Sequence, residues 1–259
     1  VINYVAIVDF ENFSNSKFKY AVADSIEEAF LIDEGISYDI NRLESSHWFL
    51  TANEKLLYQY EVTARQFPSI ETAVTPVNGI QTSANKVFII DKKDVIGEDE
   101  TSIIFEVKRK NKREQFSIEK SLLKNFYQTP SNTQGKSYIP VVSKKYVIFP
   151  YRDGKVINSN NMESNYPKTK RYLEKHKNEL LPKSLGGKRD VQYVTEWYQY
   201  GRTQSLKESI EDKILVGVMS NQPNFNIDRN QMLFASGGTA GYIALMKKDD
   251  SPYSLEYIQ

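Results

Sequence analysis

The chain has 259 residues, of which 40% are hydrophobic, and this is enough to bury a substantial core in one large or two small domains. No run approaches the roughly 18 apolar residues of a membrane-spanning helix, and the first residues lack the order of a secretory signal, so we expect a cytoplasmic protein without a membrane partner. The absence of cysteine excludes disulfides and thiolate zinc sites, and two histidines are too few for a histidine-rich metal centre.

The net charge of +1 conceals an uneven distribution along the chain. Residues 1–100 hold 8 lysines and arginines against 17 acidic residues, whereas residues 101–259 hold 26 against 16. The second part is therefore a candidate for contact with a polyanion such as nucleic acid. Lysine-rich surfaces also serve solubility alone, and charge by itself does not separate these two interpretations.

The first 75 residues are predicted to hold one strand and two helices. Residues 4–10, YVAIVDF, form an apolar run typical of a buried strand, and because it opens almost at Val1 we expect the chain to be a piece of a longer protein. The S-x-x-E signature at residues 25–28 predicts a capped helix that ends near residue 33. The T-x-x-E signature at residues 51–54 predicts a second helix over 54–66. This acidic, helical stretch is typical of a connector.

From about Pro76 the sequence favours short strands. The dipeptides Asp153-Gly154 and Gly237-Gly238 are turn signals between them, and Pro167 suits the first turn of an amphipathic helix over residues 166–181. The β-like runs are residues 87–90, 102–107, 146–151, 213–219 and 241–246. We predict an α+β fold, in which a mostly β domain with interspersed helices over residues 76–259 follows the helical connector.

The motifs for methyl transfer to an amino group are missing from the sequence. Such an enzyme needs a strand followed by a glycine-rich turn for its cofactor, and an Asn/Asp/Ser-Pro-Pro-aromatic loop that orients the amine of a flipped base. The tripeptide Phe149-Pro150-Tyr151 resembles that loop only superficially, because phenylalanine has no polar group for the amine. We therefore expect no catalytic residue, no metal and no cofactor in this chain.

One alternative function is that of a magnesium-dependent nuclease. Glu106 and Lys108 on a predicted strand have the outline of an Asp…Glu-x-Lys site, in which carboxylates hold the metal and the lysine positions the attacking water. The preceding carboxylate would come from Asp91, Asp94 or Asp99. In a chain with 26% charged residues this spacing also arises by chance, and the basic run that follows is typical of a solvated strand end.

Several segments, taken in order, resemble the specificity domain of TaqI-like adenine methyltransferases. GIQTSANKVFII (79–90) resembles that domain's opening turn and strand, and SYIPVVSKKYVIFPYRDGKVI (137–157) its Phe-Pro-Tyr strand end and hairpin. The family often has glycine where this chain has Ser83. The later segments that follow in the family's order are NYPKTKRYLEKHKNELLPK (165–183), EWYQYGRTQSL (196–206), KILVGVMSNQPNF (213–225) and SGGTAGYI (236–243).

The resemblance implies that residues 76–259 are the DNA target-recognition domain of a type II or fused type IIG restriction-modification adenine-N6 methyltransferase. Residues 1–75 would be the C-terminal edge of the methyltransferase fold, including its last strand region, followed by the connector. The expected partners are double-stranded DNA and the protein's own methyltransferase domain. S-adenosylmethionine is expected in the missing upstream domain, with no cofactor in this chain.

A recognition domain has to neutralise phosphates and to present side chains to base edges. Arg202 and Gln204 offer paired hydrogen bonds to guanine and adenine, so we expect them to read bases, while the aromatic residues of WYQY (197–200) close the core. Basic residues on the helix start and the preceding hairpin are expected to hold phosphates. The predicted DNA-binding residues are Thr82, Asn85, Lys86, Lys144, Lys145, Arg152, Lys168, Lys170, Arg171, Arg202, Gln204 and Thr239.

Three functions stay open at this point, and they differ in what the isolated chain would do. A recognition domain discriminates among duplex sequences, whereas a magnesium nuclease cleaves them. A non-catalytic RNA- or protein-binding β domain does neither.

Overall fold

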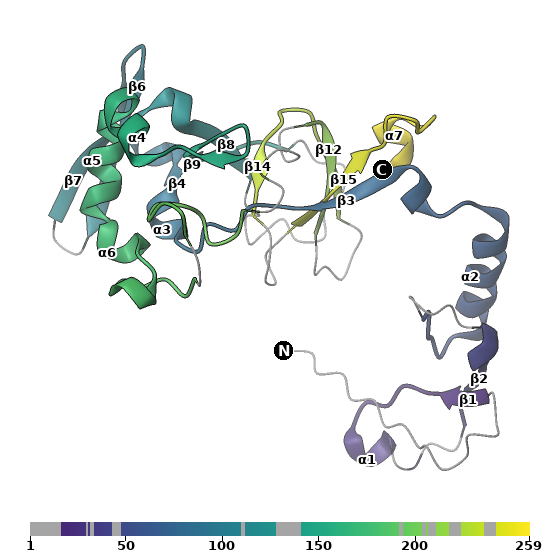
Figure 1. The fold of residues 1–259 in the computed structure, drawn as a ribbon. Helices are drawn as coiled ribbons and strands as arrows, with labels where there is room; N and C mark the ends of the chain where they lie inside the picture. Colours follow the sequence, from purple (N-terminus) through teal and green to yellow (C-terminus); the bar gives the residue numbers. More distant parts are fainter. Residues whose placement is uncertain are drawn as a thin grey trace. The chain divides into compact units, whose positions relative to one another are not determined.

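The computed structural model describes residues 17–29, 31, 34–42, 48–109, 112–127, 141–191, 194–203, 206, 211–217, 224–235 and 242–259. The chain divides into two compact units, residues 1–69 and 70–259, and each is described by itself. The second unit combines several sheets with a few short helices, so the predicted α+β, mostly β fold is confirmed (Figure 1). Among the described residues no helix is both long and apolar enough to cross a membrane. The strand predicted at residues 4–10 lies outside the described residues.

A two-stranded sheet forms the described start of the first unit. Strands β1 (Lys17–Tyr20) and β2 (Ile36–Asp39) pair antiparallel, and the rings of Phe18 and Tyr38 stack with centroids 5.6 Å apart. Helix α1 (Ile26–Ala29) lies between these strands in the chain, and the 3₁₀ turn η1 (Ile40–Arg42) follows them. The Glu28 amide donates to the Ser25 hydroxyl at 3.0 Å, which confirms the predicted cap of the first helix.

The second predicted helix is α2 (Glu54–Gln66), but its cap differs from the prediction. The Asn53 side chain, rather than that of Thr51, accepts from the Leu56 amide at 3.1 Å. The Thr51 hydroxyl accepts instead from the Asn53 amide at 3.1 Å. Thr51 therefore shapes the turn before the helix, and the residue next to the first helical position provides the cap.

The second unit begins with the 3₁₀ turn η2 (Ile70–Thr72) and ends with α7 (Leu255–Ile258). Its first sheet has the order β13-β12-β15-β3 and is antiparallel throughout. The predicted strands at 213–219 and 241–246 are confirmed over their described residues. The four strands are β3 (Val74–Asn78), β12 (Lys213–Gly217), β13 (Phe225–Asp228) and β15 (Tyr242–Lys247).

The second sheet has the order β14-β8-β9-β4, with a parallel pair between β14 and β8. Its strands are β4 (Ile89–Asp91), β8 (Leu123–Tyr127), β9 (Lys145–Ile148) and β14 (Leu233–Phe234). The predicted run 146–151 is divided, because Tyr151 belongs to a small hairpin of β10 (Tyr151–Arg152) and β11 (Lys155–Val156). Asp153 and Gly154 turn this hairpin with φ of 51° and 73°, which confirms the predicted turn.

The predicted strand over residues 87–90 is wrong in its first half. Val87 and Phe88 lie in the short helix α3 (Asn85–Phe88), and only the residues after it enter β4. Both amides donate to the Ala84 carbonyl, at 2.9 and 3.1 Å. The two apolar side chains are still fully buried, so burial alone did not distinguish a helical turn from a strand here.

The third sheet, β5-β6-β7, is a meander covered by helices (Figure 1). Its strands are β5 (Val95–Glu98), β6 (Ser102–Arg109) and β7 (Lys112–Glu119), with the 3₁₀ turns η3 (Lys92–Asp94) and η4 (Lys120–Leu122) beside them. The predicted strand at 102–107 is confirmed within β6. The helices are α4 (Ser159–Asn165), α5 (Pro167–Lys175) and α6 (Lys177–Leu180), followed by η5 (Lys183–Leu185).

The single helix predicted over residues 166–181 is split at His176. Pro167 occupies the first turn of α5 as expected. The His176 backbone leaves the helical region at φ −105° and ψ 12°, and its ring is buried against Phe116 and Tyr172, with centroids 5.8 and 4.7 Å away. Packing of the ring against the sheet thus coincides with the break between α5 and α6.

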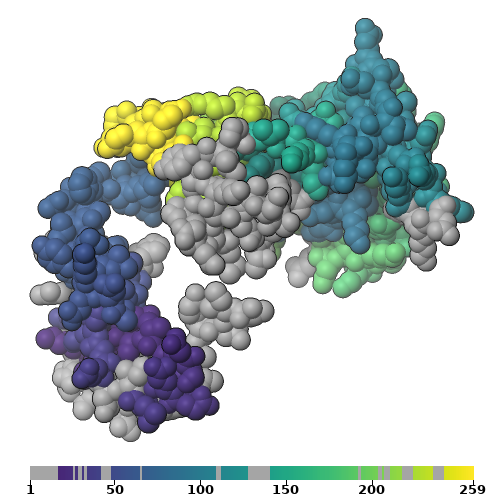
Figure 2. All heavy atoms as spheres, turned by 180° about the vertical axis from the view of Figure 1, so that it is seen from behind, coloured from purple at the N-terminus to yellow at the C-terminus, as the bar shows by residue number. Residues whose placement is uncertain are grey.

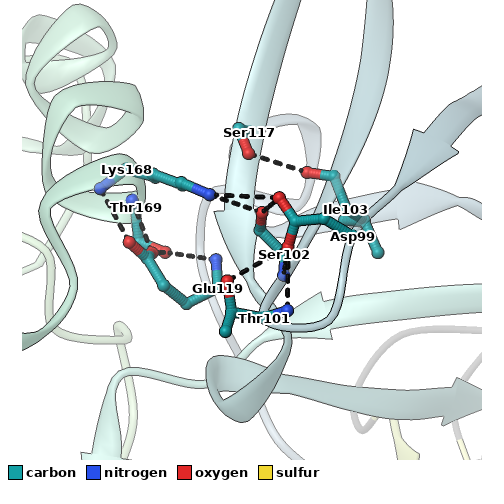
Figure 3. A network of polar contacts seen from close by, with 8 residues as sticks. All are labelled: Asp99, Thr101, Ser102, Ile103, Ser117, Glu119, Lys168 and Thr169. Carbon is teal, nitrogen blue, oxygen red and sulfur yellow. Dashed lines mark hydrogen bonds and ion pairs between the residues drawn. The ribbon is translucent and has the colours of Figure 1, made fainter.

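A buried carboxylate joins α5 to the third sheet (Figure 3). Glu119 at the end of β7 accepts from the backbone amides of Lys168 and Thr169, both at 2.8 Å, and from the Thr169 hydroxyl at 2.5 Å. These amides are among the donors that the first turn of a helix leaves without an intrahelical partner. A negative charge here also interacts favourably with the helix dipole. The sheet therefore fixes the start of α5.

Candidate functional site

Two segments far apart in the sequence meet in the second unit. Arg202 and Gln81 form an isolated antiparallel bridge, in which the Arg202 amide donates to the Gln81 carbonyl at 3.2 Å. The Gly201 amide donates to the Thr82 carbonyl at 3.3 Å. We call residues 80–86 and 197–203 the paired loops. They contain four of the residues predicted to contact DNA.

A glycine permits the close approach of the paired loops. A Cβ atom added to Gly201 would lie 1.9 Å from the Ser83 hydroxyl and 2.6 Å from its Cβ. Ser83 itself has φ of 55°, in the left-handed region where glycine is usually preferred. Ser83 therefore adopts a backbone conformation that glycine accommodates with less strain.

The buried side chain of Arg189 donates hydrogen bonds to both paired loops. Its side chain is 3% exposed, and its guanidinium donates to the carbonyls of Leu180, Trp197, Gln199 and Thr82. The contacts of Nη1 with Gln199 and of Nη2 with Trp197 are 2.5 and 2.8 Å long. Burial lowers the pKa of this guanidinium to about 10, against an opposing effect of Tyr151. A single side chain thus connects α6 with both loops.

The aromatic residues of the second loop close the core, as the sequence suggested. Tyr198 and Tyr200 are fully buried, and their hydroxyls donate to the carbonyls of Ile157 at 2.6 Å and Ile148 at 2.5 Å. The Tyr200 amide donates to the Tyr151 hydroxyl at 2.6 Å. These contacts fix the backbone directly before Arg202.

The paired loops present polar side chains to solvent. Asn85, Lys86, Arg202 and Thr203 are exposed, whereas Thr82 is only 2% exposed. The Thr82 hydroxyl donates to the Asn85 side chain at 2.6 Å and accepts from the Ala84 amide at 3.1 Å. Thr82 therefore shapes its loop rather than offering a contact to a ligand. Gln204 and Thr239 lie outside the described residues.

The basic residues predicted at the start of α5 do not behave as a group. The Lys170 side chain is buried, and its ammonium donates to the Ser159 hydroxyl at 2.6 Å and lies 5.4 Å from the Trp197 ring centroid. Lys168 donates to the Ser102 hydroxyl at 2.6 Å and pairs with Asp99 at 3.4 Å (Figure 3). Arg171 is exposed. We therefore keep Lys168 and Arg171 as candidate phosphate contacts and assign Lys170 a structural role.

The three basic candidates on the preceding strands also differ. Lys144 is exposed, and Lys145 is half-buried with an ion pair to Asp91 at 3.3 Å. Arg152 is exposed and donates to the Tyr166 hydroxyl at 2.9 Å. All three remain candidates for phosphate contact. Lys145 and Arg152 would have to share their charge between a phosphate and the partner named above.

Three of the four carboxylates of the nuclease alternative, those of Glu106, Asp91 and Asp99, have a structural partner. Glu106 pairs with Arg113 at 3.7 Å across the β6–β7 ladder. Asp99 accepts from the amides and hydroxyls of Thr101 and Ser102, and these hydrogen bonds hold its pKa well below the usual range. Within the described part of the chain, no three His, Asp or Glu side chains are grouped as metal ligands.

The chain is similar to a protein of a restriction-modification system. No family model matches the chain. The chain is 30% identical over 263 aligned residues to the type II restriction enzyme and methyltransferase RM.Eco57I of Escherichia coli. The alignment covers 96% of this chain and 25% of that protein, so the chain spans about a quarter of its relative's length.

The similarity extends over both units of the chain, because nearly all of its residues are aligned. The relative is named for both restriction and methylation.

Arg189 was not singled out in the sequence, since an arginine in a Gly-Gly-Lys-Arg segment gives no local sign that it will be buried.

Proposed function

We propose that this chain recognises a specific double-stranded DNA sequence as part of a restriction-modification methyltransferase. The observation that carries the proposal is the meeting of the paired loops, which joins the segment of exposed Arg202 to the segment that carries exposed Asn85 and Lys86. The similarity to a type II restriction enzyme and methyltransferase supports the same conclusion.

The arrangement suits base readout for a physical reason. Arginine offers paired donors to guanine and asparagine offers a paired donor and acceptor to adenine, in the pattern that the major groove displays. Side chains on a fixed backbone lose less freedom when they bind than side chains on a mobile loop. The buried tyrosines and Arg189 supply that fixed backbone.

In this proposal the chemistry belongs to the remainder of a longer protein. Residues 76–259 form the target-recognition domain, and residues 1–75 connect it to the edge of a methyltransferase domain. The longer protein methylates adenine N6 with S-adenosylmethionine, which binds outside this chain. The DNA-contact set comprises Asn85, Lys86, Lys144, Lys145, Arg152, Lys168, Arg171, Arg202, Gln204 and Thr239.

The test compares a proposed base reader with a proposed phosphate contact. On a duplex enriched by the chain from a randomised pool, Arg202→Ala should weaken binding by about 1–3 kcal/mol, or roughly 5- to 150-fold, with little change on scrambled duplex. Arg171→Ala should weaken both duplexes about equally and lower the log-log salt slope by roughly one unit. Fluorescence anisotropy at several salt concentrations measures both quantities.

The matched control is Lys183→Ala, which removes an exposed cation of the same unit that already pairs with Asp190 at 3.5 Å. It should leave both affinities within about two-fold. An equal loss for Arg202→Ala on enriched and scrambled duplex would remove the base-reading assignment.

A further inference from the structure

The hairpin formed by β6 and β7 ends in a dense group of basic residues that the proposed function does not use. The two strands pair along their full length, from Ser102 opposite Glu119 to Arg109 opposite Lys112. Figure 1 shows this hairpin at the end of the second unit that lies farthest from α7. We call Lys108, Arg109, Lys112 and Arg113 the basic end of the hairpin.

The pairing at the basic end is unfavourable for the hairpin itself. Lys108 stands directly opposite Arg113, and Arg109 directly opposite Lys112, so two successive cross-strand pairs bring together residues of like charge. Like charges in directly opposed positions destabilise a β-ladder. The ion pair of Glu106 with Arg113 at 3.7 Å offsets part of the repulsion between the like charges, but the Arg113 side chain remains 70% exposed.

The other end of the hairpin is firmly held. Ile103 and Ile118 are buried, the Phe105 and Phe116 rings pack edge-to-face on Tyr172 of α5, and Glu119 caps that helix. From the opposed phenylalanines to the Lys108–Arg113 pair is three residues along the ladder, or about 10 Å. In the space-filling view the residues of this sheet gather at the end of the second unit opposite the C-terminal residues (Figure 2). The basic end is thus presented from a rigid base.

Both faces of the ribbon carry positive charge at this end. Cross-strand partners point to the same face and successive residues to opposite faces, so Lys108 and Arg113 lie on one face and Lys112 on the other. Lys108, Lys112 and Arg113 are exposed. A ribbon with cations on both faces is complementary to a groove whose two walls are both lined with phosphates.

We propose that the basic end of the β6–β7 hairpin is a second DNA-contact element, which enters a groove of the duplex and binds the phosphates on both sides of it. The major groove, about 12 Å wide, admits a two-stranded ribbon. Lysine and arginine at its end neutralise phosphates and add affinity that is independent of sequence. This inference extends the proposed function to a contact separate from the paired loops.

The experiment measures binding of the full chain to enriched and scrambled duplex DNA from 50 to 200 mM salt. The variant is Lys108→Gln/Lys112→Gln, which removes one cation from each like-charge pair and keeps the ion pair of Arg113 with Glu106. Two lost phosphate contacts lower the log-log salt slope by about 1.8. The ratio of the binding constant of the unaltered chain to that of the variant should therefore fall about 12-fold between 50 and 200 mM salt. The loss should be equal on both duplexes.

Thermal unfolding separates this role from a structural one. Because the variant relieves two like-charge pairs, its Tm should stay equal or rise while its DNA affinity falls. The control Lys120→Gln/Lys183→Gln makes the same change in net charge at a half-buried and an exposed lysine that pair with Glu98 and Asp190, and it should keep the full salt slope.

The possible results distinguish failure of the hairpin inference from failure of the proposed function. A hairpin variant with the slope of the unaltered chain, or a control with an equal loss, overturns the inference and leaves the proposed function standing. A chain that binds through the hairpin but prefers no sequence contradicts the proposed function alone. A folded chain that binds no duplex contradicts both.

Discussion

Replacing Arg189 by methionine is expected to destabilise the chain by about 3 kcal/mol, because carbonyls in four places lose a charged donor and buried acceptors are costly without one. Arg189→Lys keeps the charge, but a compact ammonium with three donors cannot reproduce the planar fork that contacts several carbonyls. The free energy of unfolding of Arg189→Lys should lie between that of the unaltered chain and that of Arg189→Met. Urea unfolding of the full chain, with Lys188→Met at the exposed neighbouring position as control, measures these differences.

The same substitution should loosen the paired loops locally. The amides of Gly201 and Arg202 donate to carbonyls of the opposite loop, so their hydrogen exchange reports whether the loops remain together. We expect faster exchange at these two amides in Arg189→Met than in Lys188→Met. Unchanged stability together with unchanged exchange would show that Arg189 does not hold the loops.

Replacing Asp228 by asparagine is expected to cost about 3–5 kcal/mol, because it leaves a buried ammonium without its counter-charge. Asp228 and Lys213 are both fully buried, stand opposite each other on β13 and β12, and pair at 2.8 Å. Burial lowers the pKa of Lys213, with Asp228 acting in the opposite direction. The two carboxylate oxygens accept from different amides, Oδ1 from Asn230 and Oδ2 from Met232, both at 2.8 Å, so asparagine keeps only one of these two acceptors.

A double variant isolates the charge from the hydrogen bonds. Lys213→Met/Asp228→Asn removes the unpaired ammonium, so it should recover much of the stability that Asp228→Asn loses. Asp212→Asn is the matched surface control, because Asp212 pairs with Arg229 at the same 2.8 Å in an exposed position and should cost less than about 1 kcal/mol. Equal losses at positions 228 and 212 would contradict the argument from burial.

The sequence predicted the elements whose pattern is local. Helix α2 and the strands β6, β12 and β15 follow from apolar periodicity, and the Asp153–Gly154 turn from its dipeptide. Strand β7 was not predicted, because only Phe116 and Ile118 are apolar in its polar sequence KREQFSIE and its partner β6 supplies the rest of its environment. The break at His176 likewise depends on the packing of its ring against the sheet.

The candidate site was predicted as single residues rather than as an arrangement. Arg202, Asn85 and Lys86 were identified by type and by resemblance, but the meeting of their two loops depends on pairing between distant segments. That pairing requires a glycine at 201 and a buried arginine at 189, neither of which has a local signature of its role. Lys170 and Thr82 are buried, and the sequence does not show which polar side chains point inward.

The central claim is that this chain chooses among duplex sequences, and selection from a pool of randomised duplexes tests it most directly. The full chain is incubated with the pool at moderate salt, and bound duplexes are recovered and sequenced over several rounds. We predict enrichment of one short motif, whose binding exceeds that of its scrambled version and loses most of this preference in Arg202→Ala. Retention of duplexes by the folded chain without any enriched motif would contradict the claim.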